Sequence, residues 1–587
     1  MYQLFLLHNF KDNRTCIPGG RFENLLLVCI TTILFCLALW SHFKCFVDSW
    51  LVSKIYAFAF GGVLCGIWIL VKPNRQAFSI SHISLGYMAF IVYYTLLIVL
   101  SPFIESNVAI IALISFLLIY LFFKIIPISI RFGINLIIII LCLCEAVFGL
   151  YRCVSIGMPV YGISGHFDNP AGFAMCIACG IPFCCPLLKS DKFVERCFAI
   201  ISVGVIMVAI LLSKSRTGIM ASMIVLCWYM IYCFKCHRNA KFEHKYLWMM
   251  IFGAVTLMGC IFLFKADSAV GRLFIWMNSL ELAYESPVWG HFPGGFLHLY
   301  MKEQAEYFGH HADSKYWIFA DNVAHPFNEY LLFFVENGIV GLLLLGAILY
   351  KVLKLGKSST YGLAILCVVI CACFSYPMRY PFMAVILAYS LAQIETEQVA
   401  LPYHRIYSIG GKIIIAGYIL VGCIILFKDM KFEKQWYVVT MASVEGKPAL
   451  HNYEALYQNW NGNPYFLYNY GALLNQMAEF GLSADVLNKC QKYFDDYDVR
   501  MILADDYMHM GNYYEAELQY YNAINMCPNR FMPLGCLLKL YIAQKKYGAA
   551  YDIAIQILDK PIKIPSATVH RIKREAEEYL TTTILPS

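Results

Sequence analysis

A succession of long apolar runs fills almost all of the sequence before Lys428. Each run is close to the ~20 residues that a helix needs to cross the apolar core of a bilayer. Charged residues make up only 14% of the chain, against ~25% in soluble domains. We therefore predict an all-α, polytopic membrane domain over residues 1–427, in contact with membrane lipids and with about thirteen spans. The predicted spans are residues 22–41, 55–72, 83–104, 107–123, 133–150, 171–188, 196–213, 218–235, 247–264, 331–350, 360–376, 382–396 and 410–427.

The basic residues predict how this domain is oriented. Lys and Arg gather in alternate loops, for example at residues 72–75, 189–196, 235–245 and 351–357, and the loops between them carry fewer. Basic loops stay on the cytoplasmic side of a membrane, so the N-terminus is expected inside. An odd number of spans then places everything after Phe427 outside, which is the periplasm for a bacterial inner membrane. The net charge of +7 belongs to these loops and does not predict binding to nucleic acid.

Two short cysteine motifs have spacings that also occur at cofactor sites. Cys176 and Cys179 have CxxC spacing but lie inside an apolar run, where Cys behaves as a small apolar side chain. Cys233, Cys236 and His237 spell CxxCH, the pattern of c-type haem attachment. The predicted topology puts this motif on the cytoplasmic side, away from where such haem is attached. We expect no metal and no cofactor.

Three arginines on the predicted outer face are not explained by the orientation rule. Arg216 lies at the start of a span, Arg272 opens a long outer loop, and Arg379 lies between two spans. Arginine keeps its charge and presents a planar fork that suits phosphate oxygens. Several such residues at one membrane face predict a site for a pyrophosphate group. The alternative is that each is a helix-end anchor whose stem lies along lipid.

The long outer loop, residues 266–330, is the one long polar insertion in the apolar part of the chain. It ends with His325, Asn328 and Glu329, just before the next span. A histidine there can accept or donate a proton near neutral pH, and the amide and carboxylate could bind substrate. A capping or interfacial histidine is the alternative.

A second outer loop, residues 151–170, offers Asp168 and Asn169 to the same face. Asn169 precedes a proline that begins the next span, so a plain capped turn is an equal alternative. Glu145 lies inside a span near its outer end. A carboxylate there is a functional candidate, or it simply pairs with Arg152.

From Lys428 the apolar runs stop, and residues 428–587 are predicted to form a periplasmic helical-repeat domain. Residues 499–565 repeat at a spacing of about 34 residues, the tetratricopeptide period, with an earlier, degenerate unit over 464–498. The repeated positions are Tyr507, Gly511, Tyr513, Ala516 and Ala523, which recur as Tyr541, Lys545, Tyr547, Ala550 and Ile557. Such units are helix pairs that stack into a solenoid. We expect a protein partner to bind through residues 464–565.

Four pieces of sequence occur in order: GISGHFDNPAGFA, SKSRTGIMAS, GRLFIW…SPVWGHFPGGF and AHPFNEYLLFFVENGIVGLL. Together they resemble the O-antigen ligase and polymerase superfamily, which includes lipopolysaccharide ligases and bacterial O-oligosaccharyltransferases. The resemblance covers residues 145–400. It implies a metal-independent, GT-C-like glycosyltransferase. Such an enzyme takes a glycan from an undecaprenyl-pyrophosphate carrier at the periplasmic face and joins it to an acceptor hydroxyl.

The same resemblance implies roles for individual residues. Arg216 and Arg272 correspond to the arginines that bind the pyrophosphate, Arg379 is a weaker counterpart, and His325 stands for the family's histidine. Many members carry this histidine directly before the Asn of an HN-x-Y-L pattern, where this chain has Phe327. The arginines would stabilise the charge of the leaving group. His325, or a carboxylate such as that of Asp168 or Glu329, would take the proton of the acceptor hydroxyl.

The acceptor stays open at this point between lipid A-core, a protein Ser or Thr, and the growing end of a polysaccharide. The last of these would make the chain a polymerase of O-antigen or capsule. Two non-enzymatic alternatives are a transporter and an assembly scaffold. A transporter would be expected to show internal repeats and ionisable residues at mid-membrane, and a scaffold would leave the arginine pattern without a role.

Overall fold

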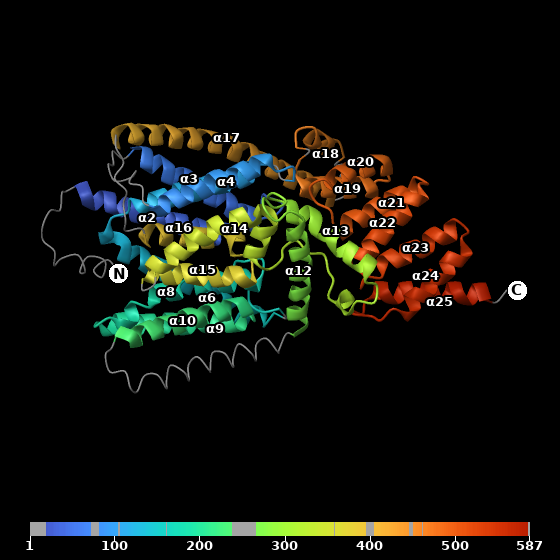
Figure 1. The fold of residues 1–587 in the computed structure, drawn as a ribbon, viewed down its shortest axis with the longest axis horizontal. Helices are drawn as coiled ribbons and strands as arrows, with labels where there is room; N and C mark the ends of the chain where they lie inside the picture. Colours follow the sequence, from blue (N-terminus) through green and yellow to red (C-terminus); the bar gives the residue numbers. More distant parts are fainter. Residues whose placement is uncertain are drawn as a thin grey trace.

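The computed structural model describes residues 19–71, 82–103, 106–159, 161–236, 266–356, 359–394, 404–444, 450–460 and 462–584. Every regular element within these residues is a helix. Long helices lie side by side in one bundle, and a group of shorter helices lies beyond one end of it (Figure 1). The predicted all-α polytopic fold is confirmed.

The bundle is built from α2 (Gly19–Trp40), α3 (Leu51–Val71), α4 (His82–Leu100), α5 (Ser106–Lys124), α6 (Ile128–Ile156), α7 (Pro170–Ala178), α8 (Ile181–Cys184), η1 (Leu187–Lys189), α9 (Phe193–Leu212), α10 (Arg216–Cys236), α14 (Glu329–Gly356), α15 (Thr360–Phe374), α16 (Pro381–Ile394) and α17 (His404–Val444). Seven helical stretches are long and apolar enough to cross a membrane, and five shorter apolar helices lie among them. These twelve coincide with twelve predicted spans. The remaining one, 247–264, lies outside the described residues, as does His237 of the CxxCH motif.

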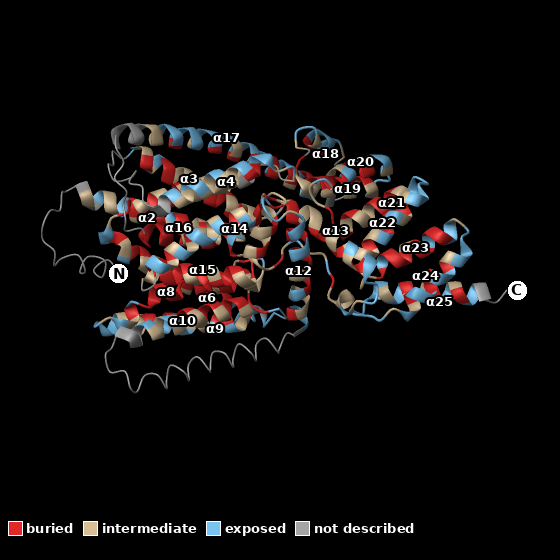
Figure 2. Cartoon of the chain, viewed as in Figure 1, coloured by how far each residue is buried: buried red, intermediate tan, exposed pale blue. Residues whose placement is uncertain are grey.

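Burial in the bundle follows the pattern that lipid requires. Residues of α8, α15 and α16 are mostly buried, whereas α17 is largely exposed along its length (Figure 2). Between Ile413 and Phe427 the exposed side chains of α17 are themselves apolar, as at Ile413, Leu420 and Phe427. A helix that is apolar on its exposed face is typical of lipid contact, because water would favour polar side chains there.

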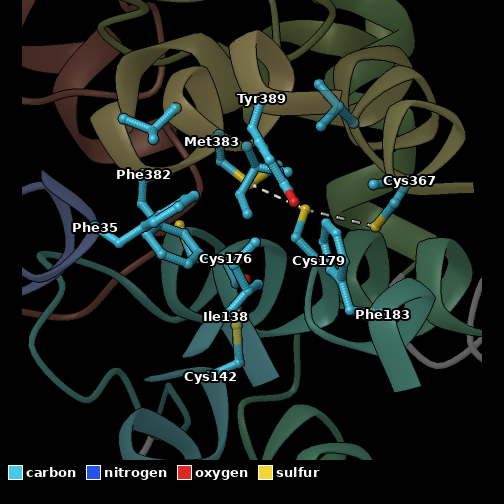
Figure 3. Close-up of a cluster of buried hydrophobic side chains, with 14 of the residues drawn as sticks. Phe35, Ile138, Cys142, Cys176, Cys179, Phe183, Cys367, Phe382, Met383 and Tyr389 are labelled. Carbon is cyan, nitrogen blue, oxygen red and sulfur yellow. Dashed lines mark hydrogen bonds between the residues drawn. The ribbon is translucent and has the colours of Figure 1, made fainter. Parts of the chain in front are cut away.

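The centre of the bundle is a close-packed cluster of aromatic and sulfur-containing side chains (Figure 3). Cys179 from the turn after α7 lies 3.8 Å from the Cys367 Sγ of α15 and 3.4 Å from the Met383 Sδ of α16. Cys176 is fully buried in the same cluster. These polarisable side chains fill the space where helices approach closely, and they tie the broken helix α7–α8 to its neighbours.

The stretch 266–330, predicted as a long polar loop, is folded. It forms α12 (Ala266–Glu285), α13 (Gly295–His310) and η2 (Lys315–Ile318). α12 crosses the end of the bundle at a steep angle to the long helices (Figure 1). The aromatic side chains of this stretch build a core, with Phe296 and Tyr300 packed against α12 and α14. The insertion is therefore a small helical platform.

A single helix joins the bundle to the C-terminal helices. α17 runs for 41 residues, which is about 60 Å. The predicted domain boundary at 427/428 lies inside this unbroken helix. Beyond it, Phe432 and Trp436 of α17 pack into the first C-terminal core with Phe466. The two parts of the chain therefore share a helix.

The C-terminal helices are α18 (Leu450–Tyr457), α19 (Pro464–Gln476), α20 (Phe480–Cys490), α21 (Tyr497–His509), α22 (Tyr513–Met526), α23 (Met532–Ala543), α24 (Tyr547–Asp559) and α25 (Ala567–Ile584). Consecutive helices from α19 to α24 pack against each other. The predicted repeat over 499–565 coincides with α21–α22 and α23–α24, and the degenerate unit with α19–α20. The tetratricopeptide assignment itself stays a prediction.

The turn inside each of these three pairs has the same backbone conformation. Ala478, Gly511 and Lys545 all have positive φ, at 61°, 76° and 59°. In each turn the amide of the following residue donates to the carbonyl five positions earlier, as Lys546 does to Tyr541 at 2.9 Å. This is the left-handed helix end that glycine favours. The repeat thus places a glycine position in every pair and fills it with glycine only once.

We expect Lys545→Gly to stabilise the α23–α24 pair by up to about 1 kcal/mol, because a side chain in the left-handed region costs about that much. The reciprocal change Gly511→Lys should destabilise α21–α22 by about as much. Hydrogen–deuterium exchange of the full-length protein, followed by mass spectrometry of peptides from each pair, measures both effects. Equal exchange in wild type and both variants would contradict the assignment of these turns.

Candidate active site

Five separate segments meet at the end of the bundle beneath the platform. They are the turn before α7, the start of α10, the second turn of α12, the irregular segment before α14, and the short link between α15 and α16 that contains η3 (Pro377–Arg379). These segments carry Asp168, Arg216, Arg272, His325 and Arg379. Hydrogen bonds, ring contacts and charge interactions between these segments join them into one continuous site.

Arg216 and Arg272 lie close together, and we call them the arginine pair. Arg216 Nη2 donates to Ser268 Oγ at 2.8 Å. Arg272 Nη1 donates to the Phe374 carbonyl at 3.0 Å, and its guanidinium lies 5.1 Å from the centre of the Phe327 ring. The pKa of Arg272 is lowered to about 10, first by burial and then by the positive charge of Arg216. The two cations therefore repel each other in this arrangement.

Neutral groups hold Arg272 in place. The Phe374 carbonyl at the end of α15 also accepts from Thr217 Oγ1 at 3.3 Å, so it ties α10 and α12 to one point. Among the described residues no carboxylate lies within the 4.0 Å of a salt bridge to Arg272. A carbonyl and an aromatic face orient the guanidinium without neutralising its charge.

His325 lies against Arg379 and Tyr376. Its Nε2 is 3.2 Å from Arg379 Nη1, and its ring stacks on Tyr376 with centroids 5.1 Å apart. Arginine has only donors, so Nε2 is the acceptor and the proton of the neutral ring is on Nδ1. Burial, followed by the charge of Arg379, lowers the pKa of His325 to about 4. The histidine is thus neutral at pH 7 and its lone pair is engaged.

Asp168 and Asn169 face the same cluster. Asp168 Oδ1 accepts from the Tyr380 hydroxyl at 3.0 Å, and Oδ2 lies 4.0 Å from Arg379 Nη2. Asn169 both caps the next helix and faces the site, so the two roles considered for it are compatible. Its Oδ1 caps α7 by accepting from the Gly172 amide at 2.8 Å, while Nδ2 donates to the Tyr380 hydroxyl at 2.7 Å.

A buried charged network holds this turn in position. Glu145, fully buried on α6, accepts from the His166 amide at 2.8 Å and from Trp40 Nε1 at 2.8 Å. The alternative considered for Glu145, a pairing with Arg152, is not formed: Arg152 donates to the Gly165 carbonyl at 2.8 Å instead. A Cβ on Gly165 would lie 2.1 Å from Glu145 Oε1, so the turn approaches the carboxylate as only glycine allows.

Asn328 and Glu329, predicted to bind substrate, both make structural hydrogen bonds. Asn328 Oδ1 accepts from the Tyr330 and Leu331 amides, at 3.0 and 3.1 Å, and so caps α14. Glu329 Oε1 accepts from the Met378 amide at 3.0 Å. The latter bond fixes the link that carries Arg379 against the start of α14.

Sequence reasoning overlooked three aromatic residues of the site. Tyr376 and Tyr380 lie on either side of Arg379 in sequence, and their rings stack with centroids 6.2 Å apart. Phe327, noted only for replacing a histidine, faces Arg272 across its ring. The signal available for the tyrosines was their place beside an arginine in a short outer link. Nothing in the sequence indicated which arginine Phe327 would meet.

Residues 200–346 match the family described as O-antigen ligase. This part of the chain is an O-antigen ligase domain. The match supports the resemblance inferred from the sequence and implies glycosyltransferase-type activity with a ligase or polymerase role. It contains Arg216, Arg272 and His325, whereas Asp168 and Arg379 lie outside it on either side. The curated proteins compared with the chain gave no match.

The chain is therefore a membrane protein with a glycosyltransferase-type domain, and such a domain takes a lipid-linked glycan and an acceptor as substrates. Among the described residues no group of three or more His, Cys, Asp or Glu side chains is arranged to hold a metal ion. That transfer needs no metal stays a prediction.

The lowered pKa of His325 predicts a specific pH dependence of stability. Between pH 6.5 and about 4 the unfolded chain binds a proton that the folded chain does not, so the free energy of unfolding falls as pH falls through that window. The wild type should lose up to about 3 kcal/mol relative to His325→Gln. Thermal unfolding of both proteins in detergent from pH 7 to 4 measures this. His310→Gln, at an exposed histidine, is the control, and curves for His325→Gln parallel to wild type would refute the burial argument.

Proposed function

We propose that this protein transfers a glycan from an undecaprenyl-pyrophosphate carrier to an acceptor hydroxyl at the periplasmic face of a bacterial inner membrane, without a metal. The observation that carries this proposal is the arginine pair. Two guanidiniums close enough to lower the pKa of Arg272 are a configuration that an anion stabilises. A pyrophosphate has the charge to neutralise both and the oxygens to accept from both forks.

The surroundings of the pair support a lipid carrier. Leu273, Leu280 and Tyr284 are exposed along α12, and their spacing of seven and four residues places them on one face of the helix. Leu273 directly follows Arg272. An exposed apolar stripe on a helix that crosses the end of a membrane bundle is typical of a helix lying in the bilayer interface. The isoprenoid chain of a carrier would run along this stripe while its pyrophosphate lies at the arginine pair.

In this mechanism the arginine pair acts on the leaving group. Negative charge builds on the pyrophosphate as its bond to the sugar breaks. Positive groups that are already in place stabilise that charge without reorganisation. Attack of the acceptor oxygen on the opposite side of the sugar carbon would invert its configuration in one step.

Of the three proposed bases, Asp168 is the best placed to accept a proton from the acceptor hydroxyl. The His325 lone pair is engaged by Arg379, and Glu329 accepts from a backbone amide. The Asp168 side chain is 30% exposed, and a carboxylate has about four acceptor positions, of which the Tyr380 hydroxyl uses one. His325 then serves to orient Arg379 beside this carboxylate.

The products that are lost or left behind distinguish the possible acceptors and the direction of synthesis. Deletion of the gene should remove the O-antigen ladder from lipopolysaccharide if lipid A-core is the acceptor, and glycoprotein staining if a protein is. If the protein is a polymerase, its deletion should instead leave only single repeat units attached to the acceptor. The C-terminal repeat domain favours a protein acceptor, because helical-repeat grooves bind polypeptide. This preference rests on analogy with other repeat proteins.

Replacing Arg272 tests the arginine pair. Arg272→Ala should lower transfer at least about a hundredfold, because loss of one group that stabilises a leaving anion has effects of that size. Arg272→Lys should transfer at a rate between those of the wild type and Arg272→Ala, because it keeps the charge but loses the planar fork. Transfer by purified protein in liposomes containing lipid-linked glycan is the measurement. Arg196→Ala, on the predicted opposite face, should transfer normally, and wild-type rates from Arg272→Ala would reject the proposal.

A comparison of two further variants tests the base. Asp168→Asn should lower the rate constant of transfer about 10²–10⁴-fold, as expected for a lost general base. His325→Gln, whose amide oxygen can still accept from Arg379, should lose much less. A larger loss in His325→Gln than in Asp168→Asn would return the role of base to the histidine.

A further inference from the structure

The segment that carries His325 has little structure of its own. Residues 320–328 lie between η2 and α14 without regular backbone hydrogen bonding. The position of His325 is therefore decided by what the segment touches. On one side, Trp276 Nε1 of the platform helix α12 donates to the Pro326 carbonyl at 2.8 Å. The other side is covered by the C-terminal domain.

Two residues in the turn between α22 and α23 hold the beginning of the segment. Asn529 Nδ2 donates to the carbonyls of both Ile318 and Ala320. Arg530 Nη2 donates to Asp321 Oδ1 at 2.9 Å. The donors come from residues more than two hundred positions further along the chain, so only the docked domain brings them here.

The start of α21 holds the next residue. Asn322 Nδ2 donates to Asp496 Oδ2 at 2.7 Å and to Asp498 Oδ2 at 3.2 Å. Arg530 also approaches Asp498, at 3.8 Å, so one guanidinium bridges the segment and α21. Asn322 is three residues before His325, so at most about 10 Å of extended chain separates the two residues.

Apolar contacts connect the C-terminal domain, through this segment, with the arginine pair. Met526 and Cys527 of the α22 end belong to the same buried cluster as Phe296 and Tyr300, and Val323 and Phe327 pack against it. Gln304 of α13 joins the segment to α22, because its Nε2 donates to the Asp321 and Met526 carbonyls. Phe327 in turn faces Arg272.

We propose that the C-terminal helical domain is a structural part of the active site, in which Asn529 and Arg530 are positioning residues. They hold residues 318–322, and through them place His325 against Arg379. This inference deepens the proposed function and rests on it for the meaning of the site, but the positioning itself is measurable without any substrate.

Chemical labelling of histidines measures the positioning directly. Diethyl pyrocarbonate modifies accessible neutral imidazoles, and mass spectrometry of the full-length protein in nanodiscs gives a rate for each histidine. We expect Asn529→Ala and Arg530→Ala to raise the labelling rate of His325 about tenfold, because each removes hydrogen bonds that oppose local opening. Arg530→Lys, which keeps the charge, should restore part of the protection.

Matched controls lie in the same domain. Asn459→Ala and Arg571→Ala alter exposed residues away from the segment and should leave His325 at the wild-type rate. His166, held by Glu145 at 2.9 Å, is the internal reference for the membrane domain. An unchanged His325 rate in both positioning variants would overturn the proposal. An equal rise at His166 would also overturn it, since that result means general loosening.

Transfer kinetics complete the test. The positioning variants should lower kcat more than they raise KM for the lipid-linked donor, because α10 and α12 still carry the arginine pair. Increased labelling of His325 with an unchanged kcat would overturn the role in catalysis. If the wild type makes no glycoconjugate at all, the proposed function fails while the labelling result still decides whether the domain positions His325.

Discussion

Two like charges held side by side at the end of a helix bundle are the constraint around which the site is built. Arg216 and Arg272 come from different helices, and their repulsion has to be opposed by the rest of the fold. The Phe374 carbonyl, the Phe327 ring and the packing of the platform supply that opposition. Such a site is stabilised when an anion enters, so binding and the relief of repulsion are one event.

Much of the bundle could be predicted because lipid leaves the backbone few choices. Apolar runs of sufficient length must be helices, and the runs coincide with the helices found. The arginines were also predictable, since their positions departed from the rule that explains other basic residues. The partners were not: the Asn529–Ala320 contact and the Arg152–Gly165 contact depend on how distant segments pack. Local spacing carries no information about such pairs.

The histidine shows how geometry bears on a role predicted from the sequence. His325 is central to the cluster, but its lone pair is directed at Arg379 and burial keeps it neutral. We therefore propose the neighbouring carboxylate for proton transfer. The platform was predicted as a loop. Its aromatic side chains pack against one another and give it a core of its own.

The unbroken course of α17 has a geometric consequence for the C-terminal helices. Residues 428–444 extend the last membrane helix by about 25 Å, and their inner face is buried in the first C-terminal core. The repeat domain is thus carried on a stiff stalk at a fixed height, and it is fastened a second time at the platform. Because the C-terminal helices are attached both to this stalk and to the platform, they keep one position relative to the candidate site.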